Sequence, residues 1–222
     1  MRAVIFKEHG GVDRLIHTEV PNPVPGQNEA LVCVRACALN HLDIWTRQGM
    51  PSISIPLPHI LGCDVSGEVE QINGKSNIKK GTRVVISPGM SCSRCKWCRM
   101  GWDSLCDQYK ILGFQVDGGY AEFVKVPVQN LIPVSDRYSW EEWASCPLVF
   151  LTAWHMLVTR AQLQSGETVL IHAAGSGVGS AGIQIAKHLG ARVIATVGSD
   201  EKEAFAKKWG ADFVINYQKT DF

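Results

Sequence analysis

The 222-residue sequence has no excess of charge of either sign and no hydrophobic run of clear transmembrane length. Lysine and arginine number 22 against 21 acidic residues, which gives a net charge of +1. So balanced a charge lacks the basic footprint that nucleic acids and anionic membranes attract, so we expect neither as a partner. The longest stretch without a formal charge, residues 143–159, contains Pro147 and His155 and is slightly short for a membrane span. We expect it to form a buried helix.

A secretion signal, an internal repeat and a low-complexity segment are also missing. The first apolar stretch, in MRAVIFKEHGG, carries charges and no small-residue cleavage site, so it predicts a first strand and not a signal peptide. Hydrophobic residues make up 45% and charged residues 19%, as in ordinary soluble globular proteins. The spacing of the eight cysteines suits a metal better than a disulfide framework, which favours a reducing, cytoplasmic compartment.

Short β-like runs dominate residues 1–127. Five of them carry β-branched or alternating patterns: AVIF, LVCVRA, GEVEQI, TRVVIS and AEFVKV. Turn-forming segments such as PNPVPGQNE and VDGG separate them. This pattern predicts a compact β barrel or sandwich, with the cysteine-rich stretch at 90–110 as an excursion from it.

The pattern changes to α/β in residues 128–222. Ser139 and Glu142 form a capping box that opens a helix. After it we expect a strand at 168–173, a glycine-rich turn, a helix to about Leu189, a strand at 192–197, a second helix and a strand at 213–216. Such βαβαβ alternation predicts a parallel sheet with right-handed crossovers.

Four of the eight cysteines fall within sixteen residues in the spacing C-x₂-C-x₂-C-x₇-C. Four thiolates can surround one ion as a tetrahedron and leave no open position for substrate or water. The stretch therefore predicts a metal site that stabilises a loop, and the alternative is a set of free or disulfide-linked thiols. The expected ligands are Cys92, Cys95, Cys98 and Cys106.

A glycine-rich turn joins the expected strand at 168–173 to the following helix. Backbone N–H groups of such a turn, together with the positive end of the helix, can hold a phosphate. The apolar strand before it and the amphipathic helix after it strengthen a motif that is weak alone. The alternative is a turn whose glycines serve packing only. The candidate phosphate-binding residues are Gly175, Ser176, Gly177, Val178 and Gly179.

The acidic residue that would hold the ribose hydroxyls of NAD is missing. It is expected about 20 positions after the glycine turn, at the end of the second strand. The residue found there is Val197, followed by Gly198 and Ser199, with Lys202 close by. Because a carboxylate would repel a 2′-phosphate, its absence favours NADP(H) over NAD. Lys202 can also be an ordinary solvated lysine, as its acidic neighbours Asp200 and Glu201 suggest.

From its first residue to its last, the chain resembles the medium-chain dehydrogenase/reductase superfamily, which includes zinc alcohol dehydrogenases and quinone oxidoreductases. The resemblance lies in LNHLDIWTRQG (39–49), PHILGCDVSGEV (58–69), LTAWHML (151–157) and AAGSGVG (173–179). It implies an α/β protein with a GroES-like N-terminal β barrel, a lobe with one structural zinc, and a Rossmann parallel sheet. The four cysteines resemble the ligands of that zinc.

The catalytic zinc ligands of this family are not preserved. Asn40 stands at the first ligand position, Cys63 at the histidine position and Leu148 at the third. Asparagine is a poor zinc ligand and leucine is none, whereas a Lewis-acid zinc needs three good ligands. A rearranged site remains an alternative, built from His41, His59, Cys63, Asp64 and Cys146.

The loss of these ligands makes the chain similar to the quinone oxidoreductases. That resemblance implies that Asn40 orients a carbonyl or quinone oxygen and that Thr152 lies near the nicotinamide; with Asp43 these are the candidate catalytic residues. It also implies a 2′-phosphate site formed by Gly198, Ser199, Lys202 and Tyr217. The expected activity is NADP(H)-dependent hydride transfer to a quinone, enone, aldehyde or ketone without catalytic zinc. A zinc-dependent alcohol dehydrogenase with atypical ligands and a non-catalytic nucleotide-binding protein are the alternatives.

The same resemblance implies a truncated Rossmann sheet, because family members continue beyond the third strand. The strand at 168–173 would then have one bare, apolar edge, which favours pairing with another strand. We expect the chain to associate with itself as a homo-oligomer, and to act on a small-molecule substrate.

Overall fold

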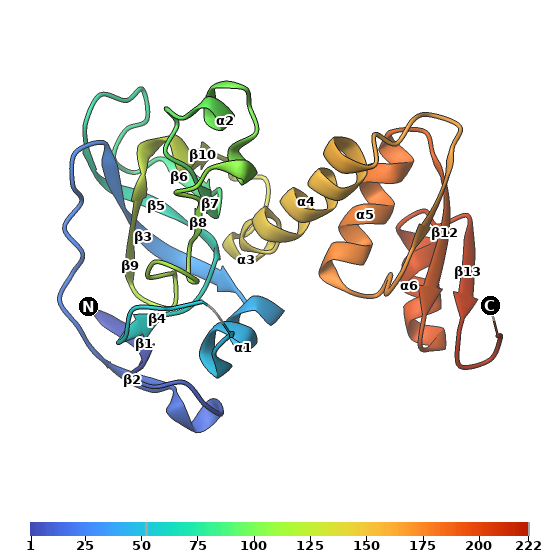
Figure 1. Ribbon diagram of the computed structural model, residues 1–222, viewed down its shortest axis with the longest axis horizontal. Helices are drawn as coiled ribbons and strands as arrows, with labels where there is room; N and C mark the ends of the chain where they lie inside the picture. Colours follow the sequence, from blue (N-terminus) through green and yellow to red (C-terminus); the bar gives the residue numbers. More distant parts are fainter. Residues whose placement is uncertain (52, 222) are drawn as a thin grey trace. The chain divides into compact units, whose positions relative to one another are not determined.

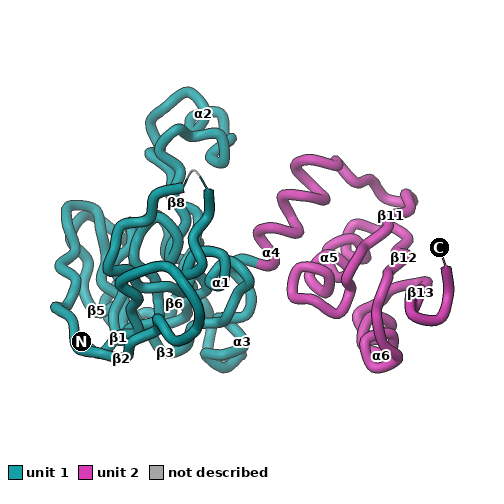
Figure 2. The backbone as a smooth tube through the Cα atoms, turned by 60° about the horizontal axis from the view of Figure 1, so that its bottom comes forward, with its two compact units in different colours: residues 1–148 teal, residues 149–222 magenta. Residues whose placement is uncertain are grey.

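The computed structural model describes residues 1–51 and 53–221, and it divides into two compact units, Met1–Leu148 and Val149–Phe222 (Figure 2). The units divide later in the chain than the predicted domain boundary at 127/128. The reason is helix α3 (Trp140–Ala144), which packs on strands β3 (Glu29–Ala38) and β5 (Asp64–Asn73) of the first unit. The Ser66 hydroxyl fixes this contact by donating to the Trp140 carbonyl oxygen at 2.6 Å.

The first unit is built from antiparallel sheets, and every predicted β-run forms a strand (Figure 1). The largest sheet has the order β10-β6-β5-β3-β9, a second has the order β2-β1-β4, and β7 pairs with β8 at the base of the cysteine-rich lobe. The remaining strands are β1 (Arg2–Phe6), β2 (Ile16–Glu19), β4 (His59–Ile60), β6 (Arg83–Ile86), β7 (Gly89–Met90), β8 (Lys110–Ile111), β9 (Phe123–Pro127) and β10 (Leu131–Pro133).

Alternating strand residues form the core of this unit. Val32 of β3, Val65 and Val69 of β5, and Val84 and Ile86 of β6 are all buried. Helix α1 (His41–Gln48) follows β3, and α2 (Lys96–Arg99) lies in the cysteine-rich lobe. Three 3₁₀ turns complete the unit: η1 (Val12–Arg14), η2 (Asp103–Leu105) and η3 (Val128–Asn130).

The second unit contains the predicted parallel sheet, with the strand order β11-β12-β13. Helix α5 packs on β11 and β12, and α6 packs on β12 and β13. The first strand ends two residues earlier than predicted, because the chain turns at Ala173, whose φ is 51°. The elements are β11 (Thr168–Ile171), α5 (Gly177–His188), β12 (Arg192–Val197), α6 (Asp200–Lys208) and β13 (Phe213–Asn216).

The uncharged stretch 143–159 is helical but not buried as predicted. It begins in α3, continues in α4 (Pro147–Trp154) and ends in a π-helical turn, η4 (His155–Arg160). Only Ala144, Ala153 and Leu157 are buried, whereas Leu151, Trp154 and Met156 are exposed. The stretch has apolar side chains on all of its faces. Only one face packs on a core, so the apolar side chains on the other faces stay exposed. In the part of the chain that is described, no helix is long and apolar enough to cross a membrane.

Candidate functional site

The four predicted metal-binding cysteines come together in the lobe carried by β7 and β8. Their sulfur atoms all lie within 4.8 Å of one another, with 3.5 Å between Cys95 and Cys98 and 3.9 Å between Cys92 and Cys98. A tetrahedral zinc with Zn–S bonds of about 2.3 Å would separate its sulfur ligands by about 3.8 Å. The set therefore has the right size and the right donor atoms for one zinc ion.

Backbone amides of the lobe favour the thiolate forms that a metal needs. The amides of Cys95 and Gln108 donate to the sulfurs of Cys92 and Cys106, each at 3.4 Å. Amides of Arg94 and Cys95 lower the pKa of Cys92 to about 6. All eight cysteines are free of disulfide bonds.

Asp43 organises the segment that begins α1. Asn40 precedes the helix as its N-cap, and its backbone N–H donates to the Asp43 carboxylate at 2.7 Å. The same carboxylate, only 6% exposed, accepts from the Gly62 amide at 3.2 Å and from the Tyr120 hydroxyl at 2.7 Å. Burial and the contact with Asp43 raise the pKa of Tyr120, so its proton stays on the hydroxyl as a donor. Asp43 thus acts as a positioning residue beneath Asn40.

The side-chain amide of Asn40 is held by its neighbours in β5 and just before it. Its Nδ2 donates to the Asp64 carboxylate at 2.9 Å and approaches the Cys63 sulfur at 3.5 Å. The other carboxylate oxygen of Asp64 accepts from the backbone N–H of Leu148 at 2.6 Å. Asp64 is 1% exposed, and burial raises its pKa to about 6 although both hydrogen bonds oppose this shift. Burial likewise raises the pKa of Cys63, so its sulfur is a neutral thiol and a weak acceptor.

The five residues of the alternative, rearranged metal site do not assemble. Across residues 1–51 and 53–221, the four lobe cysteines are the only group of three or more His, Cys, Asp or Glu ligand atoms in metal-binding proximity. His59 instead contacts the Gly113 carbonyl oxygen at 3.2 Å and Asp117 at 3.4 Å. The His41 ring packs against Trp45. Thr152, the third candidate catalytic residue, lies half-buried in α4 and belongs to the second unit.

The glycine-rich turn has a geometry that requires its small residues. Ser176 caps α5, and its hydroxyl accepts from the Gly179 amide at 3.0 Å. A Cβ on Gly179 would lie 2.4 Å from the Ala173 carbonyl oxygen, so no side chain fits there. A Cβ on Gly177 would lie 2.9 Å from Val149. The turn therefore brings bare backbone to the start of α5, which is what a phosphate contact needs.

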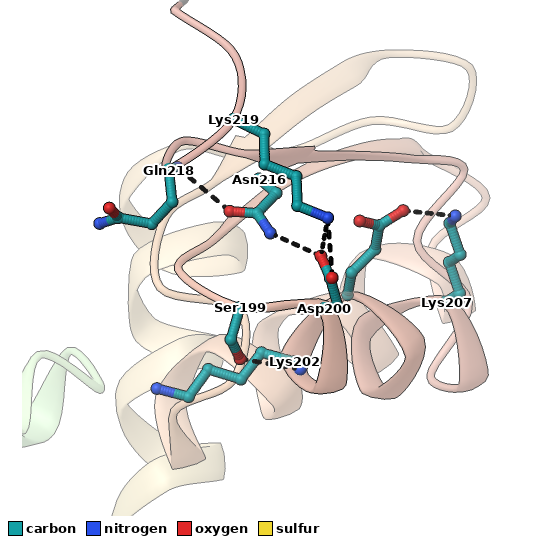
Figure 3. Close-up of polar contacts among 8 residues, drawn as sticks. Ser199, Asp200, Lys202, Lys207, Asn216, Gln218 and Lys219 are labelled. Atoms are coloured by element: carbon teal, nitrogen blue, oxygen red, sulfur yellow. Dashed lines mark hydrogen bonds and ion pairs between the residues drawn. The ribbon is translucent and has the colours of Figure 1, made fainter.

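Close contacts link the four residues predicted around a 2′-phosphate, and Figure 3 shows two of them, Ser199 and Lys202. Ser199 caps α6 and accepts from the Lys202 amide at 3.3 Å. A Cβ on Gly198 would lie 2.4 Å from the Tyr217 hydroxyl, and one on Gly175 would lie 2.8 Å from Cγ of Lys202. Lys202 thereby connects the start of α6 to the glycine-rich turn. The binding roles of these residues stay predictions.

Comparison with known proteins agrees with this geometry. Residues 26–136 match the alcohol dehydrogenase GroES-like domain family, and residues 177–222 match the zinc-binding dehydrogenase family. The chain belongs to the medium-chain dehydrogenase/reductase superfamily. This superfamily member is 35% identical over 207 residues to an alcohol dehydrogenase of Geobacillus stearothermophilus. It is 30% identical over 224 residues to a quinone oxidoreductase of Pongo abelii.

These two matches cover 91% and 100% of the chain but 60% of each relative. A crystal structure of an NAD-dependent alcohol dehydrogenase superimposes with a TM-score of 0.95 at 49% identity, over 98% of this chain and 64% of that one. The chain therefore spans about three fifths of the length of the curated relatives that it matches. The predicted GroES-like and Rossmann fold is confirmed.

Sequence reasoning missed several residues of the two sites. Tyr120 carried no motif, and Asp64 was considered only as a possible metal ligand, although it holds the amide of Asn40. Lys219 was also missed: it forms an ion pair with Asp200 at 2.6 Å. Tyr217, two residues before Lys219, was the only candidate residue near it.

Proposed function

We propose that the protein is an NADP(H)-dependent oxidoreductase that transfers a hydride to a quinone, enone, aldehyde or ketone without a catalytic zinc. The observation that carries the proposal is the unpaired ammonium group of Lys202 beside the glycine-rich turn. Among the described residues, none offers an acceptor within hydrogen-bond distance of its Nζ. An unpaired cation beside bare backbone N–H groups suits a dinucleotide with an additional phosphate.

NADPH, when bound, would supply the hydride to the electrophilic carbon of the substrate, and a proton from solvent would neutralise the charge that develops on the carbonyl oxygen. The amide of Asn40 is suited to orient that oxygen. One of its N–H groups is directed to the Asp64 carboxylate, and the other faces only the weakly accepting sulfur of Cys63. A carbonyl oxygen is a stronger acceptor than a thiol. The second N–H can therefore donate its hydrogen bond to the substrate oxygen and not to the Cys63 sulfur. Asp43 holds the backbone of Asn40 in place meanwhile.

The four lobe cysteines would hold one structural zinc. Four sulfur ligands complete the tetrahedron, so this ion would have no open position for substrate and would stabilise only the lobe. We therefore propose one zinc per chain, and a small-molecule carbonyl or quinone as the substrate.

A zinc alcohol dehydrogenase with atypical ligands is the alternative from the sequence, although Cys63 and Asp64 accept from the amide of Asn40 and the described residues assemble no group of three ligand atoms there. Metal analysis of the purified chain separates the two proposals. One zinc per chain, released only with thiol modification of the lobe, supports the first. Two zinc ions per chain, with alcohol oxidation lost when the more weakly held ion is removed, support the second.

The activity test mixes the chain with NADPH or NADH and a panel of quinones, enones and aldehydes, and follows the absorbance of the reduced nicotinamide. We expect NADPH to be oxidised faster than NADH. We expect Asn40→Ala to lower kcat at least about tenfold while NADPH still binds, since one orienting hydrogen bond in a transition state contributes on that scale. Leu39→Ala is the matched control, because Leu39 is the adjacent residue and is 83% exposed. NADPH binding without oxidation of any substrate would instead indicate a non-catalytic nucleotide-binding protein.

A further inference from the structure

Asp200 lies three residues beyond Val197, the position at the end of β12 where an acidic residue would select NAD in a Rossmann sheet. It is the first residue of α6 and follows the end of β12 after Gly198 and Ser199. A free carboxylate in this region can bind the ribose hydroxyls of NAD and repels a 2′-phosphate. An unpaired Asp200 would therefore act against the NADP(H) preference proposed above.

Asp200 is not free in the structure (Figure 3). Its two carboxylate oxygens lie 2.6 Å and 2.7 Å from Nζ of Lys219, and one of them accepts from Nδ2 of Asn216 at 3.0 Å. Asn216 is only 6% exposed, at the end of β13, and its own side-chain oxygen accepts from the Gln218 amide at 3.1 Å. The orientation of Asn216, and hence that of Asp200, is fixed from within the fold. The contact with Lys219, followed by that with Asn216, lowers the pKa of Asp200, so its carboxylate stays ionised and paired.

The lysines of α6 and of the segment after β13 have distinct environments. Lys219 is paired with Asp200, and Lys207 is paired with Glu203 at 2.6 Å one turn away. The side chain of Lys202 extends away from the Asp200–Lys219 pair in Figure 3 and packs over Gly175 instead. The positive charge of Lys202 is thus available to a ligand, whereas Lys219 is occupied by the carboxylate.

We propose that Lys219 is a specificity-determining residue that, with Asn216, neutralises and holds Asp200, so that the end of β12 accepts an adenosine ribose bearing a 2′-phosphate. The proposal rests on the NADP(H) preference proposed above and deepens it. The side chains of Lys219 and Asp200 are 61% and 68% exposed. Their pairing therefore acts in a solvent-screened setting, and its effect on binding is modest and falls with salt.

The test measures the dissociation constants of 2′,5′-ADP and 5′-AMP by calorimetry, and uses the ratio of the two. We expect Lys219→Ala to reduce the preference for 2′,5′-ADP about three- to tenfold at low salt, with a smaller effect at high salt. Lys207→Ala also removes one positive charge, from the last turn of α6, and should leave the ratio unchanged. The double variant Asp200→Asn with Lys219→Ala should recover the wild-type ratio, because no carboxylate remains to be neutralised.

Each other outcome decides a separate point. An unchanged ratio in Lys219→Ala refutes the proposal. A reduced ratio that the double variant does not recover also refutes it, because Lys219 would then contact the phosphate itself. A wild-type ratio that favours 5′-AMP refutes the NADP(H) preference, and failure to bind either nucleotide refutes the cofactor site. Thermal melts of all variants check that the three exposed substitutions leave the fold intact.

Discussion

At the scale of single residues, the site around Asn40 contains two acidic groups for which residues 1–51 and 53–221 offer no cationic partner. Asp64 and Asp43 are both buried, and backbone N–H groups, an amide and a hydroxyl satisfy them. Uncompensated burial makes the charged form of an acid costly, and the charge of Asp43 adds to the cost at Asp64. The structure therefore gives up stability to hold the amide of Asn40 in one orientation, as sites built for function often do.

This cost predicts a pH dependence for Asp64→Asn. The pKa of Asp64 rises from 3.8 to about 6 on folding, so its stabilising contribution is complete below about pH 4 and is lost as the pH rises through 6. Over that window the wild type loses about 3 kcal/mol of unfolding free energy that the uncharged variant does not lose. Denaturant unfolding at about pH 4.5 and about pH 7.5 should show the variant gaining relative to the wild type at the higher pH.

The Asn introduced at position 64 would place its amide opposite the amide of Asn40, which has its own cost in stability. This cost is the same at both pH values, so comparing the two values cancels it. Asp13→Asn is the matched control, since Asp13 is exposed with 70% of its side chain accessible. The free energy of unfolding could instead differ between variant and wild type by the same amount at the two pH values. That result would show that ionisation of Asp64 does not destabilise the folded protein.

At the scale of elements, the first two turns of α5 contain two glycines with opposite steric requirements. Gly179 lies against the carbonyl oxygen of Ala173, where an added Cβ would meet it at 2.4 Å. Gly182 lies one turn further along α5, and an added Cβ would come no closer than 3.4 Å, to Ile171. The first glycine is required by the close approach of two backbone segments, and the second is replaceable.

The pair therefore provides a prediction with its own control. Gly179→Ala should lower the free energy of unfolding by about 1–3 kcal/mol, because the backbone must move to admit the methyl group. It should also weaken nucleotide binding, since the Ser176 cap on the Gly179 amide is displaced. Gly182→Ala should be neutral or stabilise by up to about 1 kcal/mol, since alanine favours the helix. Thermal melts and a nucleotide titration measure both; similar destabilisation in the two variants would contradict the argument.

At the scale of the whole molecule, local patterns predicted local structure and failed where distant segments meet. The strands, the cysteine cluster and the capped start of α3 all follow from residues near one another in sequence. The contact of Asp64 with Leu148 joins positions 84 residues apart, and no periodicity encodes it. The ion pair of Asp200 with Lys219 depends on how β13 returns beside β12, which is a property of the sheet. The exposure of Leu151 and Trp154 was mispredicted because hydrophobicity alone does not say which side of a helix packs.

The predicted self-association also belongs to this scale. Within the described residues, β11 pairs only with β12, and its Leu170 is 47% exposed. An unpaired strand edge with an apolar side chain favours pairing with another strand, and a lysine there opposes it. We therefore expect light scattering to show an average mass that rises with protein concentration. Leu170→Lys should shift that rise to concentrations at least about tenfold higher.

Val12→Lys is the control: it adds the same charge at a side chain 73% exposed in the other unit, and should leave the concentration dependence of the mass unchanged. A mass equal to one chain at all concentrations would exclude association through β11, because an edge that pairs strands must do so by mass action.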